Sequence, residues 1–487
     1  MTTRPIQFHF RGGIRRIEGL AATRTVLQWL REDVLATGTK EGCAEGDCGA
    51  CTVVIGERDD AAPGGVRLAA VNACIQFLPT LDGKALFTVE DLAQKDTLHP
   101  VQQAMVDHHG SQCGFCTPGI VMSLWADYEN RPAPQTREHT QGVLSGNLCR
   151  CTGYRPILDA AEAARAEPRV EIDRAALRTS LDALAALPPL EYEAAGTRFF
   201  APRSIAELAA CYAAHPQARL LAGSTDVGLW VTKQLRELPE LIHLGAVQEL
   251  RAIERTPDHL SIGAGVTLSD AFAALVEAMP DWRELGDRFA SMPIRNAGTL
   301  GGNIANGSPI GDSMPGLIAL GGIVVLQQGA VVRELPLEDF YLAYQRNALQ
   351  PGEFVRAVRV PLNAASPTHF RTWKVSKRAD QDISAVCAGV AVTLTEGVVD
   401  FARIAFGGMA ATPSRALQCE AALAGKPWSA DTVRDAMNAL DADFAPLTYM
   451  RASAEYRKTA ARNLLWRFWL ETGAPDAPLT RIAEVVK

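Results

Sequence analysis

Long apolar runs are missing from this sequence of 487 residues. None approaches the roughly 20 apolar residues that a membrane-spanning helix needs. The amino terminus, MTTRPIQFHFRGG, alternates polar and apolar residues where a signal peptide has a continuous apolar stretch. We therefore expect a protein that does not enter a membrane and that stays in the cytoplasm.

An excess of positive charge is also missing. The chain has 48 Lys and Arg residues against 55 Asp and Glu residues, which gives a formal net charge of −7. Binding to a nucleic-acid backbone depends on basic side chains that neutralise phosphates, so we expect no nucleic-acid partner. With 47% hydrophobic residues, the composition is typical of globular proteins. The length exceeds what one hydrophobic core fills, which predicts about three or four domains.

The eleven cysteines are unevenly distributed. Eight of them precede residue 152, whereas Cys211, Cys387 and Cys419 occur singly in the remainder. In a reducing cytosol, clustered cysteines are more often metal ligands than disulfides. We interpret the three isolated cysteines as small buried hydrophobic residues.

Local patterns predict an α+β beginning. Residues 6–10 alternate like a strand, Gly12 and Gly13 supply a turn, and residues 15–19 can return as a second strand. Thr25 and Gln28 then form the pattern of a capping box at the start of a helix.

From His99 onward the sequence pattern changes to one typical of helices. Pro100 and Pro118 stand where the first turn of a helix tolerates proline, which predicts a helical unit. Residues 165–192 contain no cysteine or histidine that could bind a metal and are interpreted as a linker. The elements expected beyond it are a helix at 204–214, strands at 219–222, 241–244, 260–262, 386–394 and 401–406, and helices towards the carboxyl end.

The first cysteine group has the spacing C-x4-C-x2-C. It consists of Cys43, Cys48, Cys51 and the more distant Cys74, which is the plant-type ferredoxin spacing for a [2Fe–2S] cluster. Glycines between these cysteines let the loop wrap closely and direct N–H groups at an anionic cluster. A structural zinc site is the alternative, but zinc favours paired C-x2-C knuckles.

The second cysteine group consists of Cys113, Cys116, Cys149 and Cys151. A C-x2-C pair followed by a C-x-C pair is compatible with zinc as well as with a second cluster. The spacing alone leaves both readings open.

Two glycine-rich segments, Arg219–Asp226 (RLLAGSTD) and Arg295–Asp312 (RNAGTLGGNIANGSPIGD), could contact a diphosphate through backbone N–H groups and small hydroxyl side chains. Neither is a Rossmann fingerprint. The first segment could equally be a plain strand-to-helix turn. The second is too long and too rich in small polar residues for an ordinary connection.

Two longer motifs add a family resemblance. GSQCGFCTPGIVMS (110–123) and LSGNLCRCTGYRPI (144–157), following a plant-type cluster loop, closely resemble the molybdenum hydroxylase family, in particular the small subunit of its bacterial xanthine dehydrogenases. The resemblance implies a [2Fe–2S] cluster at the second cysteine group, next to the molybdenum site, with the first cluster towards the flavin. It also implies that Gln112 contacts the pterin of a molybdenum cofactor held by a partner.

The glycine-rich segments resemble the FAD-binding domain that this family shares with flavoproteins of the vanillyl-alcohol oxidase and MurB type. The resemblance implies that seventeen residues contact FAD. They are Arg219, Leu220, Leu221, Ala222, Gly223, Ser224, Thr225, Asp226, Phe289, Gly298, Thr299, Gly302, Asn303, Asn306, Asp312, Val355 and Lys374. Phe289 is expected beside the isoalloxazine. One departure concerns the family's acidic loop near the flavin, which here reads Asp380-Gln381-Asp382. The central amide leaves the preference for NAD⁺ over oxygen less secure.

The expected fold is therefore a multidomain α+β protein. It comprises a plant-type ferredoxin-like β-grasp domain (1–90), a helical [2Fe–2S] domain (91–165), a linker (166–192), a FAD-binding domain (193–365) and a C-terminal α+β flavoprotein domain (366–487).

The expected function is electron transfer. The resemblance implies that xanthine is hydroxylated at molybdenum on a large molybdopterin-binding partner subunit, and that electrons pass through two [2Fe–2S] clusters and FAD to NAD⁺. No catalytic residue for hydroxylation is expected in this chain, and two small with two large chains are expected to assemble. The alternatives are a subunit serving another N-heterocycle or an aldehyde, a free-standing NADH-dependent reductase, and a non-catalytic zinc scaffold.

Overall fold

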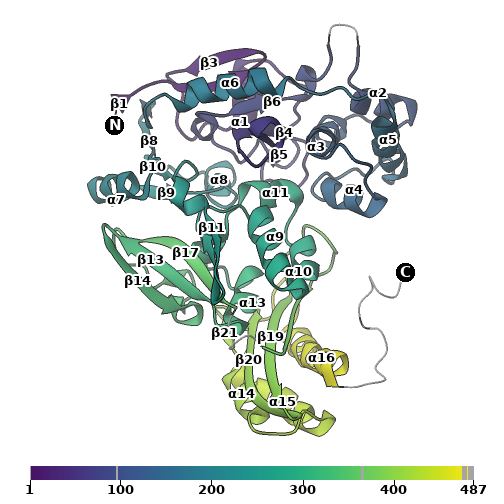
Figure 1. The fold of residues 1–487 in the computed structure, drawn as a ribbon, viewed down its shortest axis with the longest axis vertical. Helices are drawn as coiled ribbons and strands as arrows, with labels where there is room; N and C mark the ends of the chain where they lie inside the picture. The colour runs from purple at the N-terminus through teal and green to yellow at the C-terminus, as the bar shows by residue number, and fades with distance from the viewer. Residues whose placement is uncertain (1, 95–96, 363–366, 474–479, 481–487) are drawn as a thin grey trace. The chain divides into compact units, whose positions relative to one another are not determined.

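The computed structural model describes residues 2–94, 97–362, 367–473 and 480. The chain divides into two compact units (Figure 1). Unit 1 is Met1–Gln248 with Ala290–Gly298, and unit 2 is Glu249–Phe289 with Thr299–Lys487. Residues 193–365, expected as one FAD-binding domain, are thus shared between the units. The predicted boundary at 365/366 lies outside the described residues.

Unit 1 begins with a five-stranded mixed sheet in the order β3-β2-β6-β4-β5. Its strands are β2 (Ile6–Phe10), β3 (Gly13–Ile17), β4 (Thr52–Arg58), β5 (Val66–Asn72) and β6 (Ala85–Phe87). The hairpin β2–β3 confirms the prediction from the sequence. So does the capping box: Thr25 Oγ1 accepts from Gln28 N at 3.1 Å, and Gln28 Oε1 accepts from Thr25 N at 3.0 Å.

The capping box opens α1 (Val26–Gln28), which continues as the π-helical turn η1 (Trp29–Asp33). Trp29 meets the rings of Phe8 and Phe10 edge-on at centroid distances of 5.2 and 5.3 Å. Alternate residues of β2 therefore point into the core beneath this helix, as the period of a strand requires.

Four helices follow, which confirms the helical unit predicted from the sequence. They are α2 (Pro100–Asp107), α3 (Thr117–Asn130), α4 (Arg137–Leu144) and α5 (Arg155–Ala166). Pro100 and Pro118 both lie in a first helical turn, as predicted. Helix α3 is buried along most of its length and packs on β4 and β5, so it joins the helical part to the first sheet.

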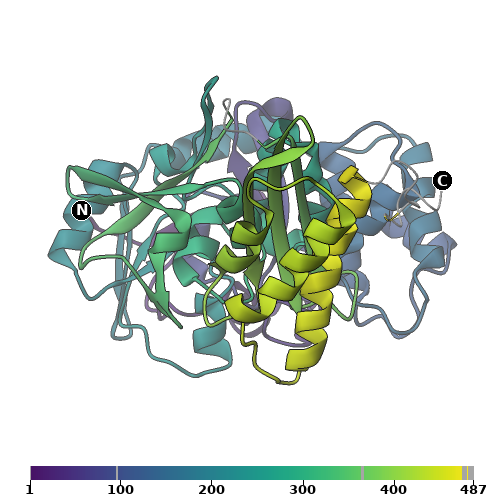
Figure 2. The same cartoon turned by 90° about the horizontal axis from the view of Figure 1, so that it is seen from below.

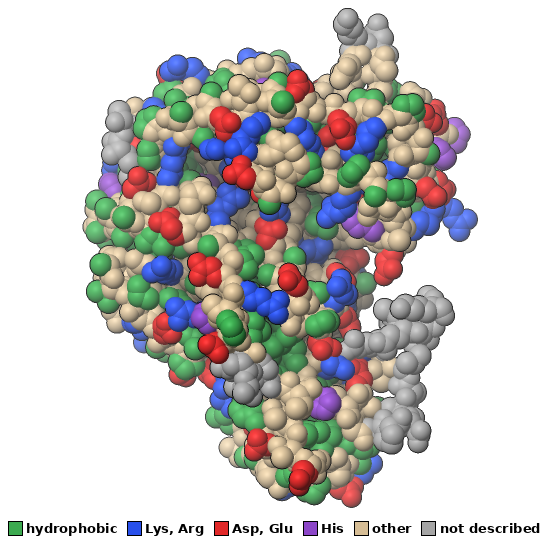
Figure 3. Space-filling model, viewed as in Figure 1, with side chains coloured by type: hydrophobic (Ala, Val, Ile, Leu, Met, Phe, Trp, Pro, Cys, Tyr) green, Lys and Arg blue, Asp and Glu red, His purple; other side chains and the backbone are tan. Residues whose placement is uncertain are grey.

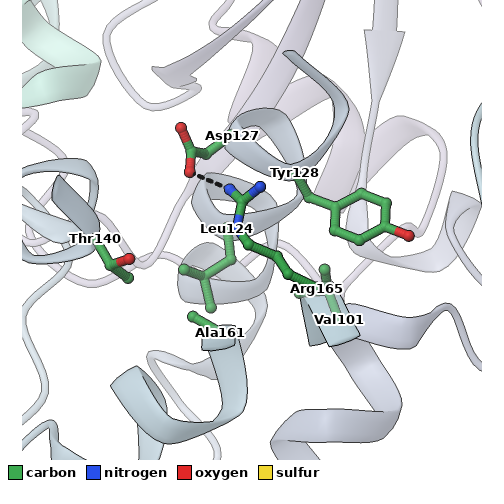
Figure 4. A pocket seen from close by; sticks show the side chains of 7 residues that line it. All are labelled: Val101, Leu124, Asp127, Tyr128, Thr140, Ala161 and Arg165. Atoms are coloured by element: carbon green, nitrogen blue, oxygen red, sulfur yellow. Dashed lines mark hydrogen bonds and ion pairs between the residues drawn. The ribbon is translucent and has the colours of Figure 1, made fainter. Parts of the chain in front are cut away.

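A small pocket lies among α2, α3, α4 and α5 (Figure 4). Its Arg165 donates to Asp127 at 2.5 Å, and the same carboxylate meets Arg131 at 3.0 Å and His139 Nε2 at 2.9 Å. The charged groups of this pocket are therefore already engaged with one another, which indicates a structural role.

The segment interpreted as a linker is packed rather than extended. It contains α6 (Arg174–Ala185), whose Leu177, Leu181 and Leu184 are buried in the same hydrophobic cluster as α3 and α5. These leucines follow the i, i+4, i+7 spacing of one helical face. Arg174 also donates to the Val66 carbonyl at 2.6 Å. Hydrophobic burial and this hydrogen bond hold the segment on unit 1.

The second sheet of unit 1 has the order β1-β7-β8-β10-β9. Its strands are β1 (Thr2–Thr3), β7 (Leu190–Ala194), β8 (Thr197–Ala201), β9 (Arg219–Leu221) and β10 (Glu240–His243), and its helices are α7 (Ile205–Ala214) and α8 (Val227–Thr232). Helix α11 (Met292–Ala297) packs on β5 of the first sheet. The expected helix at 204–214 and strands at 219–222 and 241–244 are confirmed to within a residue or two.

Unit 2 contains an antiparallel sheet in the order β11-β12-β17-β13-β14. Its strands are β11 (Ile253–Arg255), β12 (His259–Gly263), β13 (Ile323–Gln328), β14 (Val331–Pro336) and β17 (Phe354–Pro361). The helices are α9 (Leu268–Ala278), α10 (Arg283–Arg288), α12 (Leu300–Asn306) and α13 (Ser313–Ala319), and β15 (Tyr341–Ala343) with β16 (Arg346–Asn347) makes a small hairpin. Helix α12 contacts β12 and β17, which fixes the glycine-rich segment on this sheet.

A four-stranded sheet completes unit 2 in the order β18-β19-β20-β21. It consists of β18 (His369–Val375), β19 (Val386–Thr395), β20 (Val398–Gly407) and β21 (Ser414–Arg415). Helices α14 (Leu417–Leu423), α15 (Ala430–Asp443) and α16 (Ala454–Gly473) lie across it (Figure 2) and share one hydrophobic core with it. The strands at 386–394 and 401–406 and the helices after them confirm the sequence analysis.

Short 3₁₀ turns connect these elements: η2 (Pro63–Gly65), η3 (Leu78–Leu81), η4 (Val89–Asp91), η5 (Gln248–Arg251), η6 (Pro280–Trp282) and η7 (Leu337–Phe340). None of the helices in the described ranges is both long and apolar enough to cross a bilayer. Basic and acidic side chains are interspersed over the face shown in Figure 3, as expected from the small net charge.

Candidate iron–sulfur and flavin sites

The first cysteine group is assembled by one loop and one strand end. Cys43, Cys48 and Cys51 lie on the loop before β4, and Cys74 follows β5. The antiparallel pairing of β4 with β5 brings these two places together, with Thr52 opposite Asn72. The structure thus joins four cysteines that the sequence separates by up to about thirty residues.

Backbone N–H groups point at the sulfur of Cys43. The donors are Asp47 N at 3.4 Å and Cys48 N at 3.3 Å. A hydrogen bond from the Cys48 thiol, with another from Cys74, holds the pKa of Cys43 well below its ordinary value. Such donors stabilise negative charge on sulfur, so the loop suits a thiolate-bound, anionic group.

Glycine is required in this loop. Gly46 and Gly49 have φ of +78° and +71°, a region that other residues rarely adopt. A Cβ on Gly42 would lie 2.7 Å from Cys48 Sγ. The glycines identified from the sequence therefore let the chain wrap tightly around the sulfurs, as predicted.

The second cysteine group is held by the helical part of unit 1. Cys116 stands at the N-cap of α3, Cys113 lies on the preceding loop, and Cys149 and Cys151 lie between α4 and α5. The sulfurs of Cys113 and Cys151 are 3.7 Å apart. Burial, together with the neighbouring Cys149 thiol, raises the pKa of Cys116 to about 12.

Each cysteine group brings four thiols together. Contacts between thiols join Cys43 to both Cys48 and Cys74, Cys51 to Cys74, Cys113 to Cys151 and Cys116 to Cys149. Four thiols match the donor set of a [2Fe–2S] cluster, in which two thiolates hold each iron. Within the part of the chain that the structure describes, no group of three or more His, Cys, Asp or Glu side chains is arranged so that it could hold one metal ion.

The two groups differ in exposure. Cys51 and Cys74 of the first group are buried, whereas Cys113 and Cys151 of the second group are exposed, as is the adjacent Gln112. The isolated Cys211, Cys387 and Cys419 are buried, which confirms the prediction for them. Burial raises the pKa of Cys211 to about 11, so this thiol stays protonated at neutral pH.

In unit 1, the segment Arg219–Asp226 is strand β9 followed by a tight loop into α8. A Cβ on Gly223 would lie 1.9 Å from the Ala297 carbonyl oxygen, so this glycine lets the loop pack beside Gly298. Ser224 has φ of +64° and is 3% exposed, and its Oγ has no hydrogen-bond partner among the described residues. An unpartnered buried hydroxyl in a strained loop fits a polar ligand such as a diphosphate.

The remaining residues predicted in this loop follow the same path. Arg219, Leu220 and Leu221 form β9, Ala222 and Thr225 lie in the loop, and Asp226 directly precedes α8. The guanidinium of Arg219 stacks over Trp230 at 5.0 Å. Helix α8 thereby holds the start of the loop in place.

In unit 2, Thr299 caps α12 by accepting a hydrogen bond from Gly302 N at 3.0 Å. Asn303 Oδ1 accepts from Ser313 Oγ at 2.6 Å, and Asn306 is the last residue of the helix and is exposed. Four of the predicted cradle residues, Thr299, Gly302, Asn303 and Asn306, therefore lie on one short helix and its N-cap, whereas Gly298 caps the end of α11 in unit 1 and Asp312 precedes α13.

Asp312 and Lys374 form a buried ion pair. Lys374 Nζ lies 2.7 Å from Asp312 Oδ2, and Ser384 Oγ donates to Asp312 Oδ1 at 2.5 Å. Sequence reasoning missed Ser384, because a single serine beside a strand carries no distinctive signal. Both predicted residues thus have partners in the protein itself.

Phe289 and Val355 are also buried. The Phe289 ring packs on Phe272 at a centroid distance of 5.0 Å, and Val355 pairs with Leu326 in the sheet of unit 2. In the loop 380–382, Asp382 accepts from Arg378 N at 2.9 Å and from Arg451 at 3.1 Å, whereas Asp380 is exposed. One of the two carboxylates expected to influence the flavin is therefore engaged with the chain's own arginines.

Three family models match successive parts of the chain. Residues 88–162 match the [2Fe-2S] binding domain, residues 193–363 match the FAD binding domain in molybdopterin dehydrogenase, and residues 371–472 match the CO dehydrogenase flavoprotein C-terminal domain. The chain belongs to the molybdenum hydroxylase family. As such, the chain is an electron-transfer component with iron–sulfur and FAD domains.

The relatives agree with this assignment. The chain is 32% identical over 550 aligned residues to the xanthine dehydrogenase of Emericella nidulans, an alignment that covers 99% of this chain and 40% of that relative. It thus spans less than half the length of this relative. Solved structures of carbon monoxide dehydrogenase from Hydrogenophaga pseudoflava and of quinoline 2-oxidoreductase from Pseudomonas putida 86 are also similar. Their TM-scores are 0.53 and 0.51, their identities 29% and 27%, and they cover 58% and 56% of this chain and 96% and 94% of theirs.

Proposed function

We propose that this chain is the electron-transfer subunit of an NAD⁺-dependent xanthine dehydrogenase. The observation that carries the proposal is the presence of two cysteine groups, each of four neighbouring thiols, in a chain that also has both flavin domains. The similarity to a xanthine dehydrogenase over 99% of the chain supports xanthine as the substrate of the assembly.

The bound groups divide the chemistry: iron–sulfur clusters carry single electrons, and FAD converts them into hydride transfer to NAD⁺. The chain's residues bind and orient these groups. The eight cysteines of the two groups supply thiolates, and the N–H groups of Asp47 and Cys48 stabilise negative charge at the first site. In unit 1, the Ser224 hydroxyl offers a hydrogen bond to the FAD diphosphate. In unit 2, Thr299 and Asn303 hold the second glycine-rich segment in shape.

The exposed second cysteine group is proposed to face the partner. Gln112, Cys113 and Cys151 are exposed, so a large molybdopterin-binding subunit could approach this site closely. We propose an assembly of two small and two large chains, with the first cysteine group on the flavin side. Hydroxylation of the substrate then takes place on the partner.

The main alternative is that the partner acts on another N-heterocycle or on an aldehyde. An N-heterocycle is supported by the solved structure of quinoline 2-oxidoreductase, which is about as similar to this chain as that of carbon monoxide dehydrogenase. A free-standing NADH-dependent reductase is the second alternative. The purified native complex, assayed with xanthine, quinoline and an aldehyde in turn with NAD⁺, distinguishes these substrates. NADH oxidation without any associated molybdenum subunit would favour the free-standing reductase.

The chain alone should oxidise NADH with an artificial dye and leave xanthine unchanged. In the complex, Cys113→Ser should abolish xanthine-dependent NAD⁺ reduction and spare NADH–dye turnover, because only electrons from the partner cross the second cysteine group. Cys211→Ser is the matched control, since Cys211 is buried and isolated. Loss of both activities in a folded, flavin-loaded Cys113→Ser protein would contradict the proposed electron path.

A further inference from the structure

Asn147 belongs to the second cysteine loop, which connects α4 to α5 and holds Cys149 and Cys151, and its side chain reaches the first cysteine loop, which precedes β4. Its side chain is 1% exposed and uses both ends of the carboxamide. Oδ1 accepts from Ser123 Oγ at 2.7 Å, whereas Nδ2 donates to the Gly49 carbonyl at 3.2 Å and to Thr52 Oγ1 at 3.1 Å. Gly49 belongs to the first cysteine loop and Ser123 to α3, so one side chain connects both.

The backbone around Asn147 makes the same connection. Leu148 N donates to the Cys48 carbonyl at 3.0 Å, which links a residue next to Cys149 directly to a cysteine of the first group. The Tyr154 hydroxyl donates to the Asn147 carbonyl at 3.1 Å and accepts from Cys149 N at 2.8 Å. The second loop is thereby fixed to the first loop at Leu148 and is held in shape by Tyr154.

Two glycines permit this close approach. A Cβ on Gly49 would lie 1.9 Å from the Gly146 carbonyl oxygen and 2.7 Å from Asn147 Nδ2. A Cβ on Gly119 of α3 would lie 2.1 Å from the Gly49 carbonyl oxygen. Three backbone segments therefore meet at Gly49 with no space for a side chain, and the Asn147 carboxamide closes the junction.

We propose that Asn147 is a positioning residue that fixes the separation between the two iron–sulfur sites. The inference rests on the proposed function, in which both cysteine groups hold [2Fe–2S] clusters. Transfer between the sites moves one electron, breaks no bond and needs no proton. The rate of this transfer falls steeply with the distance between the two clusters. The protein must therefore hold the two cysteine loops rigidly at a fixed separation.

The chemistry of the site explains why asparagine suits it. The position needs one acceptor towards Ser123 and a donor towards Gly49 and Thr52, and a neutral carboxamide supplies both. Aspartate would present an oxygen to the Gly49 carbonyl. Alanine would leave the Ser123 hydroxyl buried without its acceptor, which favours a shift of the loops.

The chain offers a matched control. Asn130 is the last residue of α3, the helix that holds Ser123, and donates from Nδ2 to the Leu68 carbonyl of β5 at 2.7 Å. It therefore links this helix to the first sheet through a hydrogen bond of the same kind, but it touches neither cysteine loop. Asn130→Ala should perturb packing without changing the relation between the two clusters.

The test uses the full chain with its clusters, reduced and examined by electron paramagnetic resonance. Two paramagnetic clusters held close together broaden or split each other's signals. Asn147→Ala and Asn147→Asp should weaken this interaction and slow the equilibration of electrons between the clusters after flash reduction, with both clusters still present. Asn130→Ala should retain the wild-type interaction. Ser123→Ala, which keeps the Asn147 donors, should give a smaller loss and serves if Asn147 variants do not fold.

The outcomes separate the inference from the proposed function. Wild-type protein lacking two iron–sulfur signals would overturn the proposed function itself. Two interacting signals in the wild type that persist unchanged in folded Asn147→Ala, or in Ser123→Ala if that is the variant obtained, would overturn the role of Asn147 alone. An equal loss in Asn130→Ala would also overturn it, because the effect would then be general to packing.

Discussion

Lys374 Nζ lies 2.7 Å from Asp312 Oδ2 in unit 2, and both side chains are buried. Removing one partner leaves the other as an uncompensated buried charge. Lys374→Met should therefore lower the free energy of unfolding of flavin-free protein by about 3–5 kcal/mol. Chemical denaturation monitored through the tryptophans of unit 2 measures this.

The double variant Lys374→Met with Asp312→Asn should recover part of that loss, because it removes both charges. If the single variant were as stable as the wild type, the ion pair would not contribute to folding. A role of Lys374 at FAD alone would then be favoured.

Ser224 allows the flavin loop to be tested without loss of protein contacts. Its Oγ has no partner among the described residues, and its φ of +64° is easier for glycine. Ser224→Gly should therefore keep or slightly raise stability, yet lower the FAD content of the purified protein. The ratio of flavin to protein absorbance measures the content. Full FAD occupancy would show that the hydroxyl does not contact the ligand.

The iron content follows from the eight cysteines of the two groups. Purified protein should contain about four irons per chain, two for each [2Fe–2S] cluster. Cys43→Ser should remove one of two iron–sulfur signals and leave the other, since Cys43 contacts thiols of its own group only. Zinc in place of iron, or no change in either signal, would contradict the assignment of both groups.

Much of the fold was predictable because its signals are local. The hairpin, the capping box at Thr25 and the prolines at the starts of α2 and α3 depend on residues a few positions apart. The segment 166–192 was predicted less well. Its Leu177, Leu181 and Leu184 have the period of a helix, but its lack of cysteine and histidine suggested a linker.

The cysteine ligands were predictable from spacing, whereas the contacts that organise them were not. Asp312 and Lys374 are 62 residues apart, and Asn147 lies 98 residues from Gly49. Such pairs depend on how strands and helices pack, which no local pattern in one sequence specifies. The extent of each domain, and the contact of each predicted residue with FAD, remain predictions.

His99 should make the stability of unit 1 dependent on pH. Its buried Nδ1 accepts from Val101 N at 3.2 Å at the start of α2, and burial lowers its pKa below the ordinary 6.5. The folded state therefore binds fewer protons than the unfolded state. The stabilising contribution is complete above pH 6.5 and is lost as the pH falls below it.

His99→Asn should flatten this dependence, because asparagine can cap the helix and does not titrate. Protection factors of the α2 amides from hydrogen–deuterium exchange at pH values above and below 6.5, which remove the intrinsic pH dependence of exchange, provide the measurement. Protection that falls equally on acidification in wild type and His99→Asn would assign the effect to another group.

The last prediction concerns the contact between α3 and the first cysteine loop. A Cβ on Gly119 would lie 2.1 Å from the Gly49 carbonyl oxygen, which belongs to rigid backbone and has no room to move aside. Gly119→Ala should therefore push α3 away from the loop. Because Cys116 stands at the N-cap of α3, the second cluster should be altered along with the stability of unit 1.

Gly142 supplies the control for the same substitution. It lies in α4, and no atom is within 4 Å of the position of its Cβ. Gly142→Ala should be neutral or stabilising by about 0.5–1 kcal/mol, since alanine favours a helix over glycine. Thermal unfolding and the visible absorbance of the clusters, compared between the two variants, measure both effects. If Gly119→Ala matched Gly142→Ala in both readouts, the close contact at Gly49 would not hold the two cysteine loops together.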